Sequence, residues 1–162
     1  MASSTSASPD KHRRGAQHYI HLAMMTALMF VAMYALMYAM VDRFANVYSN
    51  LNQVYMAGLM TAPMVLIELL VMRGMYADWR LNTMIVAVSL LLGVLCWFGI
   101  REQVGIGNNQ FLRSMIPHHA GAILMCNESS LSSPEIQKLC AGIISSQQQE
   151  IAQMKSLLQS AK

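Results

Sequence analysis

Long apolar runs separated by short polar stretches fill most of the first hundred residues. There are three of them, roughly Tyr19 to Val41, Gln53 to Met72 and Leu81 to Ile100. Each run has about 20 residues, which as a helix crosses a hydrocarbon core of about 30 Å. Aromatic residues, which favour the membrane interface, lie at or near the run ends: Tyr19, Tyr48, Tyr55, Tyr76, Trp79 and Trp97. We therefore predict three transmembrane helices within residues 18–100.

The pattern changes after the third run. Residues 101–108 lose their periodicity and are rich in glycine, which predicts a linker that acts as a hinge. Asn108 or Asn109 can cap a following helix, and Ser133-Pro134-Glu135 supplies the start signals of another. We predict an all-α fold in which the transmembrane helices precede an extramembrane antiparallel helical hairpin, residues 109–162.

Composition and charge support a membrane protein. Of the 162 residues 55% are apolar and only 12% are charged, and the net charge of +3 is not gathered into a patch that would bind nucleic acid. Residues 1–17 form a basic tail that we expect to be disordered. Five basic residues fall on the N-terminal side of the predicted membrane and three near it on the other: Lys11, Arg13, Arg14, Arg73 and Arg80 against Arg43, Arg101 and Arg113. The positive-inside bias predicts a cytoplasmic N-terminus and a periplasmic C-terminal domain in a bacterial-type inner membrane.

Methionine is unusually frequent, with 16 copies. At helical spacing several of them form one stripe on each of the first two runs, which are Met33, Met37 and Met40, and Met56, Met60 and Met64. If the two helices pair antiparallel, these thioethers form a ladder across the membrane. The alternative is that flexible methionines simply fill gaps between helices.

A carboxyl group also lies within the second run. Glu68 is costly in such a place, so it indicates either a function or a partner. His21, at the same depth in the first run, is the partner we expect.

Side chains that bind soft metals gather between residues 111 and 126. On a helix Met115, His118, His119 and Cys126 fall within an arc of roughly 100°, so they share one face. Pro117 lies within this pattern and predicts a kink or a new helix start. On the second helix of the hairpin, one face carries Cys140, Gln147, Glu150 and Met154.

The hairpin register brings the two faces together. If its mirror point lies near residue 133, Cys126 is opposite Cys140, His119 is opposite Gln147, and Met154 lies within a turn of Met115. We predict that the two cysteines close a disulfide, since the space outside the membrane permits oxidation. The alternative is that both stay reduced as further soft ligands. The third cysteine, Cys96, stays free within the last apolar run.

The sequence Phe111-x-x-x-Met115-Ile-Pro-His-His-x-Gly-Ala-Ile-x-Met125, followed by Gln147-x-x-Glu150-Ile-x-x-Met154, resembles domain-of-unknown-function family 305 over about residues 108–159. The resemblance implies a ferritin-like helical bundle and a role in periplasmic copper binding and tolerance. It implies these metal ligands: Met115, His118, His119, Met125 and Met154, with Gln147 and Glu150 in support. Fuller members carry two His-His halves and this chain has one, so we expect the hairpin to be half of a four-helix bundle completed in a homo-oligomer, at least a dimer.

Thioether, thiol and imidazole ligands select Cu(I), and Ag(I) by the same softness. The sequence therefore predicts a membrane-anchored, outward-facing protein that binds Cu(I) or Ag(I) in copper handling or tolerance, with the lipid bilayer and the metal ion as its partners and without enzymatic activity. Two alternatives stay open. One is a structural or interaction module without metal, and the other is an enzyme with His118 or His119 as base and Glu150 as acid.

Overall fold

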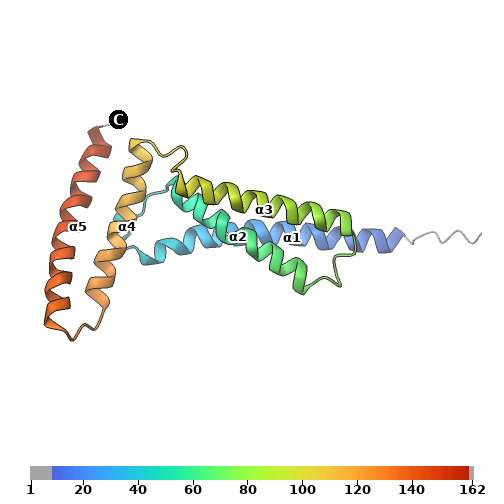
Figure 1. Cartoon of the computed structure of the whole chain (residues 1–162), viewed down its shortest axis with the longest axis horizontal. Helices are drawn as coiled ribbons and strands as arrows, with labels where there is room; N and C mark the ends of the chain where they lie inside the picture. Colours follow the sequence, from blue (N-terminus) through green and yellow to red (C-terminus); the bar gives the residue numbers. More distant parts are fainter. Residues whose placement is uncertain (1–8, 161–162) are drawn as a thin grey trace, which may run out of the picture. The chain divides into compact units, whose positions relative to one another are not determined.

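The computed structural model describes residues 9–160, and all regular secondary structure among them is helical, with no strand. Five α-helices and two short 3-10 helices follow one another in the chain (Figure 1): α1 (Pro9–Leu36), η1 (Met37–Met40), η2 (Phe44–Asn46), α2 (Leu51–Val71), α3 (Trp79–Arg101), α4 (Asn108–Glu128) and α5 (Pro134–Ser160). The predicted all-α fold is confirmed. The described residues divide into two compact units, one made of 9–33 and 56–97 and the other of 34–55 and 98–160.

Three helical stretches are long and apolar enough to cross a membrane, as the sequence predicts: Gly15–Met40, Leu51–Val71 and Trp79–Arg101. The expectation of a disordered tail over residues 1–17 is wrong from residue 9 onward, because α1 already begins at Pro9. Proline is favoured at the first helical position, and the lysine, arginine, alanine and glutamine that follow are good helix formers. Residues 1–8 lie outside the described part of the chain.

In the first unit, small residues let α2 approach α3 closely. A Cβ atom added to Gly58 would lie 2.7 Å from the Sγ atom of Cys96, and one on Gly93 would lie 3.3 Å from Ala62. The buried stripe of α2 starts at the neighbour of Gly58 and consists of Ala57, Thr61, Val65 and Leu69. Small side chains at such contacts allow helix backbones to pack tightly, which is the usual way membrane helices associate.

The methionines of α2 lie outside this packed stripe. Met56, Met60 and Met64 are 40%, 41% and 37% exposed. The small residues occupy the contact side of α2, and the expected ladder between these methionines and those of the first apolar run stays a prediction.

Replacing Gly58 with valine should destabilise the first unit by about 1–3 kcal/mol, since the added side chain overlaps Cys96 and must displace it. Thermal unfolding of the full chain in detergent measures the effect. Adding Cys96→Ala should recover part of the loss, and Gly15→Ala, where nothing lies within 4 Å, is the matched control. A Gly58→Val chain that unfolds at the temperature of the unaltered protein would contradict this packing.

Glu68 has a different partner from the one predicted. The Tyr76 hydroxyl donates to Glu68 Oε1 at 3.3 Å, whereas the His21 side chain is exposed. Tyr76 follows the end of α2 and is buried with Leu22 and Leu69. Burial, and after it the negative charge of Glu68, raises the pKa of the Tyr76 phenol. The predicted pair with His21 is therefore wrong, and a phenol in the loop between α2 and α3 satisfies the carboxylate instead.

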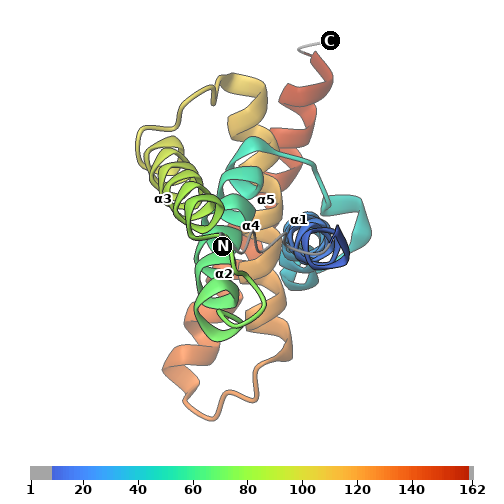
Figure 2. The ribbon, with the colours of Figure 1, turned by 90° about the vertical axis from the view of Figure 1, so that its right-hand side faces the viewer.

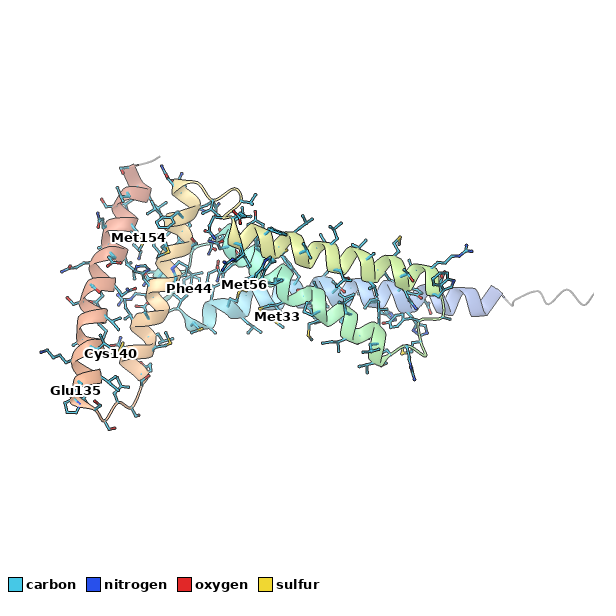
Figure 3. The ribbon with its side chains drawn as sticks, viewed as in Figure 1. Met33, Phe44, Met56, Glu135, Cys140 and Met154 are labelled. Carbon is cyan, nitrogen blue, oxygen red and sulfur yellow. A yellow bond between two sulfur atoms is a disulfide. The ribbon has the colours of Figure 1, made fainter. Side chains whose placement is uncertain are left out.

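In the second unit, α4 and α5 lie side by side and are joined by a short loop at one end (Figures 1 and 2). Their core combines Ile116, Ala120 and Ile123 of α4 with Ile151 and Met154 of α5. A disulfide links Cys126 to Cys140, whose Cα atoms are 5.3 Å apart. Figure 3 shows Cys140 near the connecting loop and Met154 toward the other end of α5. Both the helical hairpin and the disulfide are thus as predicted.

The segment before α4 is an ordered turn rather than the hinge we expected. The Tyr55 hydroxyl donates to the Val104 carbonyl at 2.8 Å, and the side-chain amides of Asn52 and Gln103 exchange two hydrogen bonds of 3.1 and 3.2 Å. Gly105 has a φ of +70°, a left-handed conformation that glycine adopts without strain. Glycine here makes a turn possible, and the hydrogen bonds to the start of α2 then fix it.

The predicted cap of α4 is also different. Gly107, not Asn108 or Asn109, is the N-cap residue, and no side chain bonds to it. The side chain of Gln110, in the first turn of α4, instead accepts a hydrogen bond from the Leu51 backbone N–H at 3.0 Å. This bond satisfies a free donor at the start of α2 and joins the two helix starts.

Candidate metal centre

The predicted ligands of the first motif all lie on one uninterrupted helix. α4 runs from Asn108 to Glu128 through Pro117, so the expected new helix start is wrong. A proline within a helix removes only one backbone hydrogen bond, and here its ring is buried, which offsets part of that loss. Helical spacing therefore decides which side chains of the motif can meet.

His119 is the buried polar residue of this helix, with 7% of its surface exposed. Its Nδ1 atom lies 2.9 Å from the Met115 carbonyl oxygen, which can only accept, so Nδ1 carries a hydrogen and donates it. Its Nε2 atom lies 2.7 Å from Glu150 Oε2 on α5. Nε2 is thus the ring nitrogen that faces the partner helix, and the Met115 carbonyl holds it in that orientation.

The pairing of His119 with Glu150 corrects the predicted register, which placed Gln147 opposite His119. Helical side chains lean toward the N-terminus of their own helix. In an antiparallel hairpin the side chain of α4 therefore leans away from the loop and that of α5 leans toward it. His119 accordingly meets Glu150, which lies one turn farther from the loop than Gln147.

The same register brings two thioethers together. Met115 lies one turn before His119 on α4, and Met154 lies one turn after Glu150 on α5, so the register of the His119–Glu150 pair predicts the two methionines as the next cross-hairpin pair. Met154 is only 8% exposed and belongs to the buried core against which Met115 packs. Two adjacent levels of the hairpin thus carry two sulfur atoms, one imidazole nitrogen and one carboxylate.

Gln147 adds an oxygen atom on the loop side of this group. Within the described residues, its Oε1 atom is the buried side-chain acceptor that has no hydrogen-bond donor. An acceptor left in this state costs about 1–3 kcal/mol unless a cation or another donor meets it. The position fits a site that receives a positively charged ligand.

The remaining predicted ligands lie elsewhere. His118 is exposed, with its ring centre 6.1 Å from that of His119, and Met125 is 53% exposed. Cys126 and Cys140 are joined in the disulfide and so are not thiolate ligands. The prediction that Met115, His118, His119 and Cys126 converge on one face is therefore wrong for His118.

Histidine, cysteine and carboxylate alone do not make a metal site here. Among the described residues, no three such side chains gather closely enough to hold an ion. A metal bound between α4 and α5 would therefore depend on the thioethers of Met115 and Met154.

Comparison with known proteins agrees with the helical motif. Residues 103–158 match the family model described as "Domain of unknown function (DUF305)". The chain is also 30% identical over 123 residues to "Uncharacterized protein L153" of Acanthamoeba polyphaga mimivirus, which covers 75% of this chain and 79% of the relative. No solved structure matches the chain.

The chain belongs to the DUF305 family through its C-terminal part, which follows three helices able to span a membrane. Residues 103–162 number only 60, so the similarity to the viral relative continues well into the apolar helices. The relative thus resembles both parts of this chain.

Proposed function

We propose that the α4–α5 hairpin binds Cu(I) or Ag(I) through the sulfur atoms of Met115 and Met154 and through His119 Nε2. Glu150 and Gln147 lie beside these atoms and provide oxygen. The proposal rests on the hydrogen bond between His119 of α4 and Glu150 of α5. One turn farther from the loop, Met115 of α4 packs against the core that contains Met154 of α5. The protein would serve copper handling or tolerance.

The chemistry of these side chains fits a soft monovalent ion better than a hard divalent one. Thioether sulfur and imidazole nitrogen select Cu(I) and Ag(I), whereas Mg²⁺ or Ca²⁺ requires several carboxylates. The ion would bind His119 Nε2 on the side that now faces Glu150 Oε2. The Glu150 side chain is 51% exposed, so it can move aside and still balance the charge of the ion.

The disulfide supports a location outside the cytoplasm. Such bonds persist mainly in oxidising compartments. We propose that the N-terminus is cytoplasmic and that the hairpin, which follows the third span, faces a periplasm-like space across a bacterial-type inner membrane. The bias of arginine and lysine toward the N-terminal side supports the same orientation.

We also propose that the protein is a homo-oligomer, at least a dimer. Several large apolar side chains of the hairpin are exposed in the single chain: Phe111, Ile136, Leu139 and Leu157. A second hairpin would cover such residues and complete a four-helix bundle.

Titration with silver nitrate tests the metal site, because Ag(I) is soft and needs no reductant that would open the disulfide. The full chain is used in chloride-free detergent solution with Cys96→Ala, which removes the free thiol. We expect His119→Ala and Met154→Leu each to weaken binding more than tenfold, or about 1.4 kcal/mol.

Met84→Leu is the matched control, because Met84 is exposed on α3 and has no place in the hairpin. It should bind like the parent chain. Unchanged affinity in both His119→Ala and Met154→Leu would refute the site. Complete absence of binding in the parent chain, with the fold intact, would favour a structural module or an enzyme.

A further inference from the structure

The side of α4 that faces away from α5 has a contact of its own. Gly121 is buried there, and a Cβ atom added to it would lie 3.3 Å from the Met40 carbonyl oxygen and 3.9 Å from the Met40 Cβ atom. The absence of a side chain at Gly121 lets the backbone of η1 rest directly on α4. Met40, the last residue of the first span-like stretch, is thereby brought to the hairpin.

A partly buried polar network holds the chain that follows Met40 in place. Lys155 Nζ of α5 donates to the Ala45 carbonyl at 3.0 Å and to Asn46 Oδ1 at 2.6 Å. Asn46 Nδ2 in turn donates to Asp42 Oδ1 at 2.6 Å, and both Asn46 and the Asp42 side chain are buried. Hydrogen bonds to charged groups are among the stronger ones in proteins, so residues 42–46 are fixed against α5. The position of Met40 on α4 is therefore built into the fold.

The two predicted ligands that do not face α5 flank this contact. His118 lies three residues before Gly121 and Met125 lies four residues after it, so all three share one side of α4. Residues at these spacings have Cβ atoms about 5–6 Å apart, which a methionine side chain can reach across. His118 and Met125 are exposed, and Met40 is 55% exposed. Two thioethers and an imidazole thus surround one glycine.

We propose that Met40, His118 and Met125 form a second soft-metal site, separate from the one between α4 and α5. The choice of Cu(I) or Ag(I) as ligand rests on the proposed function. The first site is buried and the second is exposed, so the second suits rapid exchange of the ion. Because Met40 ends the first span-like stretch, an ion held there touches both the hairpin and the membrane segment.

Methionine methyl groups report on each site separately. We propose to label them with carbon-13 in the Cys96→Ala chain and to add silver nitrate in chloride-free detergent solution while recording NMR spectra. Single methionine-to-leucine variants assign the signals. The Met40 and Met125 signals should move together with one equivalent of Ag(I), and those of Met115 and Met154 should move together with another.

Two variants connect Met40 to the other ligands. Met40→Leu keeps the volume of the side chain and should reduce the silver-induced shift of the Met125 methyl signal at least fivefold, while the Met115 and Met154 signals respond as before. His118→Ala should do the same, and Met84→Leu should change nothing.

The outcomes separate this inference from the proposed function. If Met115 and Met154 respond but Met40 does not, the second site is refuted and the first stands. If Met125 responds equally with and without Met40, the second site is also refuted. If only Met40 and Met125 respond, the second site stands and the first falls. A chain in which no methionine signal moves refutes both.

Discussion

Breaking the disulfide between Cys126 and Cys140 should lower the free energy of unfolding of the hairpin by about 3 kcal/mol. The bond closes a loop with a sequence separation of 14 residues, and a loop of about this length restricts the unfolded chain by that amount. The core that remains is small, with Ile116, Ile123 and Ile151 as its buried isoleucines. Hydrogen exchange of α4 and α5 amides, measured on the full chain in detergent with and without a phosphine reductant, should show faster exchange in both helices after reduction.

The double variant Cys126→Ala and Cys140→Ala provides the control for this experiment. Without reductant it should exchange like the reduced parent chain, and adding reductant should then change nothing. The effect should also be confined to the hairpin, since Cys96 lies in the other unit and is a free thiol. If reduction leaves the exchange of α4 and α5 unaltered, the disulfide does not stabilise the hairpin.

The helices and the disulfide were predictable from the sequence because each depends on short-range regularities. Run length alone identifies the spans, since a hydrocarbon core requires about 20 apolar residues. Ser133 and Pro134 mark the start of α5, and a mirror point near this turn places Cys126 opposite Cys140. Both predictions need only helical geometry and the position of the loop between α4 and α5.

The contacts between the three span-like helices were not predictable in the same way. The methionine stripes are the more conspicuous pattern in the sequence. The buried side of α2 is nevertheless the one with Ala57 and Gly58, because small residues let the helices approach closely. The pattern of small residues was the signal that would have found this face. The partner of Glu68 was missed for another reason, because Tyr76 reaches it from a loop whose course no periodicity specifies.

The candidate metal centre was predicted in part. The sequence places Met115, His119 and Met154 on the inner faces of the hairpin, and in the structure His119 bonds to Glu150 while Met115 packs against the core that contains Met154. The positions of His118 and His119 around the helix could not show which of them is buried, because they do not tell how much of the α4 surface α5 covers. Glu150 was also predicted to have only a supporting role. Helical side chains lean toward the N-terminus of their own helix, and this rule would have paired Glu150 with His119.

The contact of Met40 with Gly121 had no signal in the sequence at all. The two residues lie far apart in the chain, and the network that fixes the intervening loop depends on Lys155, near the end of α5. Such long-range contacts follow from the packed fold and not from local pattern. They are also what connects the exposed half of the motif to the first span-like helix.

Replacing Ile116 with alanine should destabilise the hairpin by about 2–5 kcal/mol, the largest effect we expect from a single substitution. Ile116 is fully buried, at 0% exposure, in the core that α4 and α5 share. Loss of its side chain removes apolar contacts and leaves a cavity that the surrounding helices fill only in part. Ile116→Val removes less and should cost about 0.5–1.5 kcal/mol. Thermal unfolding and hydrogen exchange of the full chain should rank the variants in this order.

Ile136→Ala, in the first turns of α5, is the matched control, because Ile136 is 48% exposed and should change stability by at most about 0.5 kcal/mol.

The stability of Ile116→Ala in the presence of silver also tests the proposed metal site. Ile116 packs in the cluster that contains Met154, so a ligand that binds only the folded hairpin must counteract the substitution. At an Ag(I) concentration about 100 times the Kd, the recovered stability should be about 2.7 kcal/mol. If Ile116→Ala is as stable as Ile136→Ala, the shared core does not hold the hairpin together. If it is destabilised and silver restores nothing, the ion does not bind to the folded arrangement of Met115, His119 and Met154.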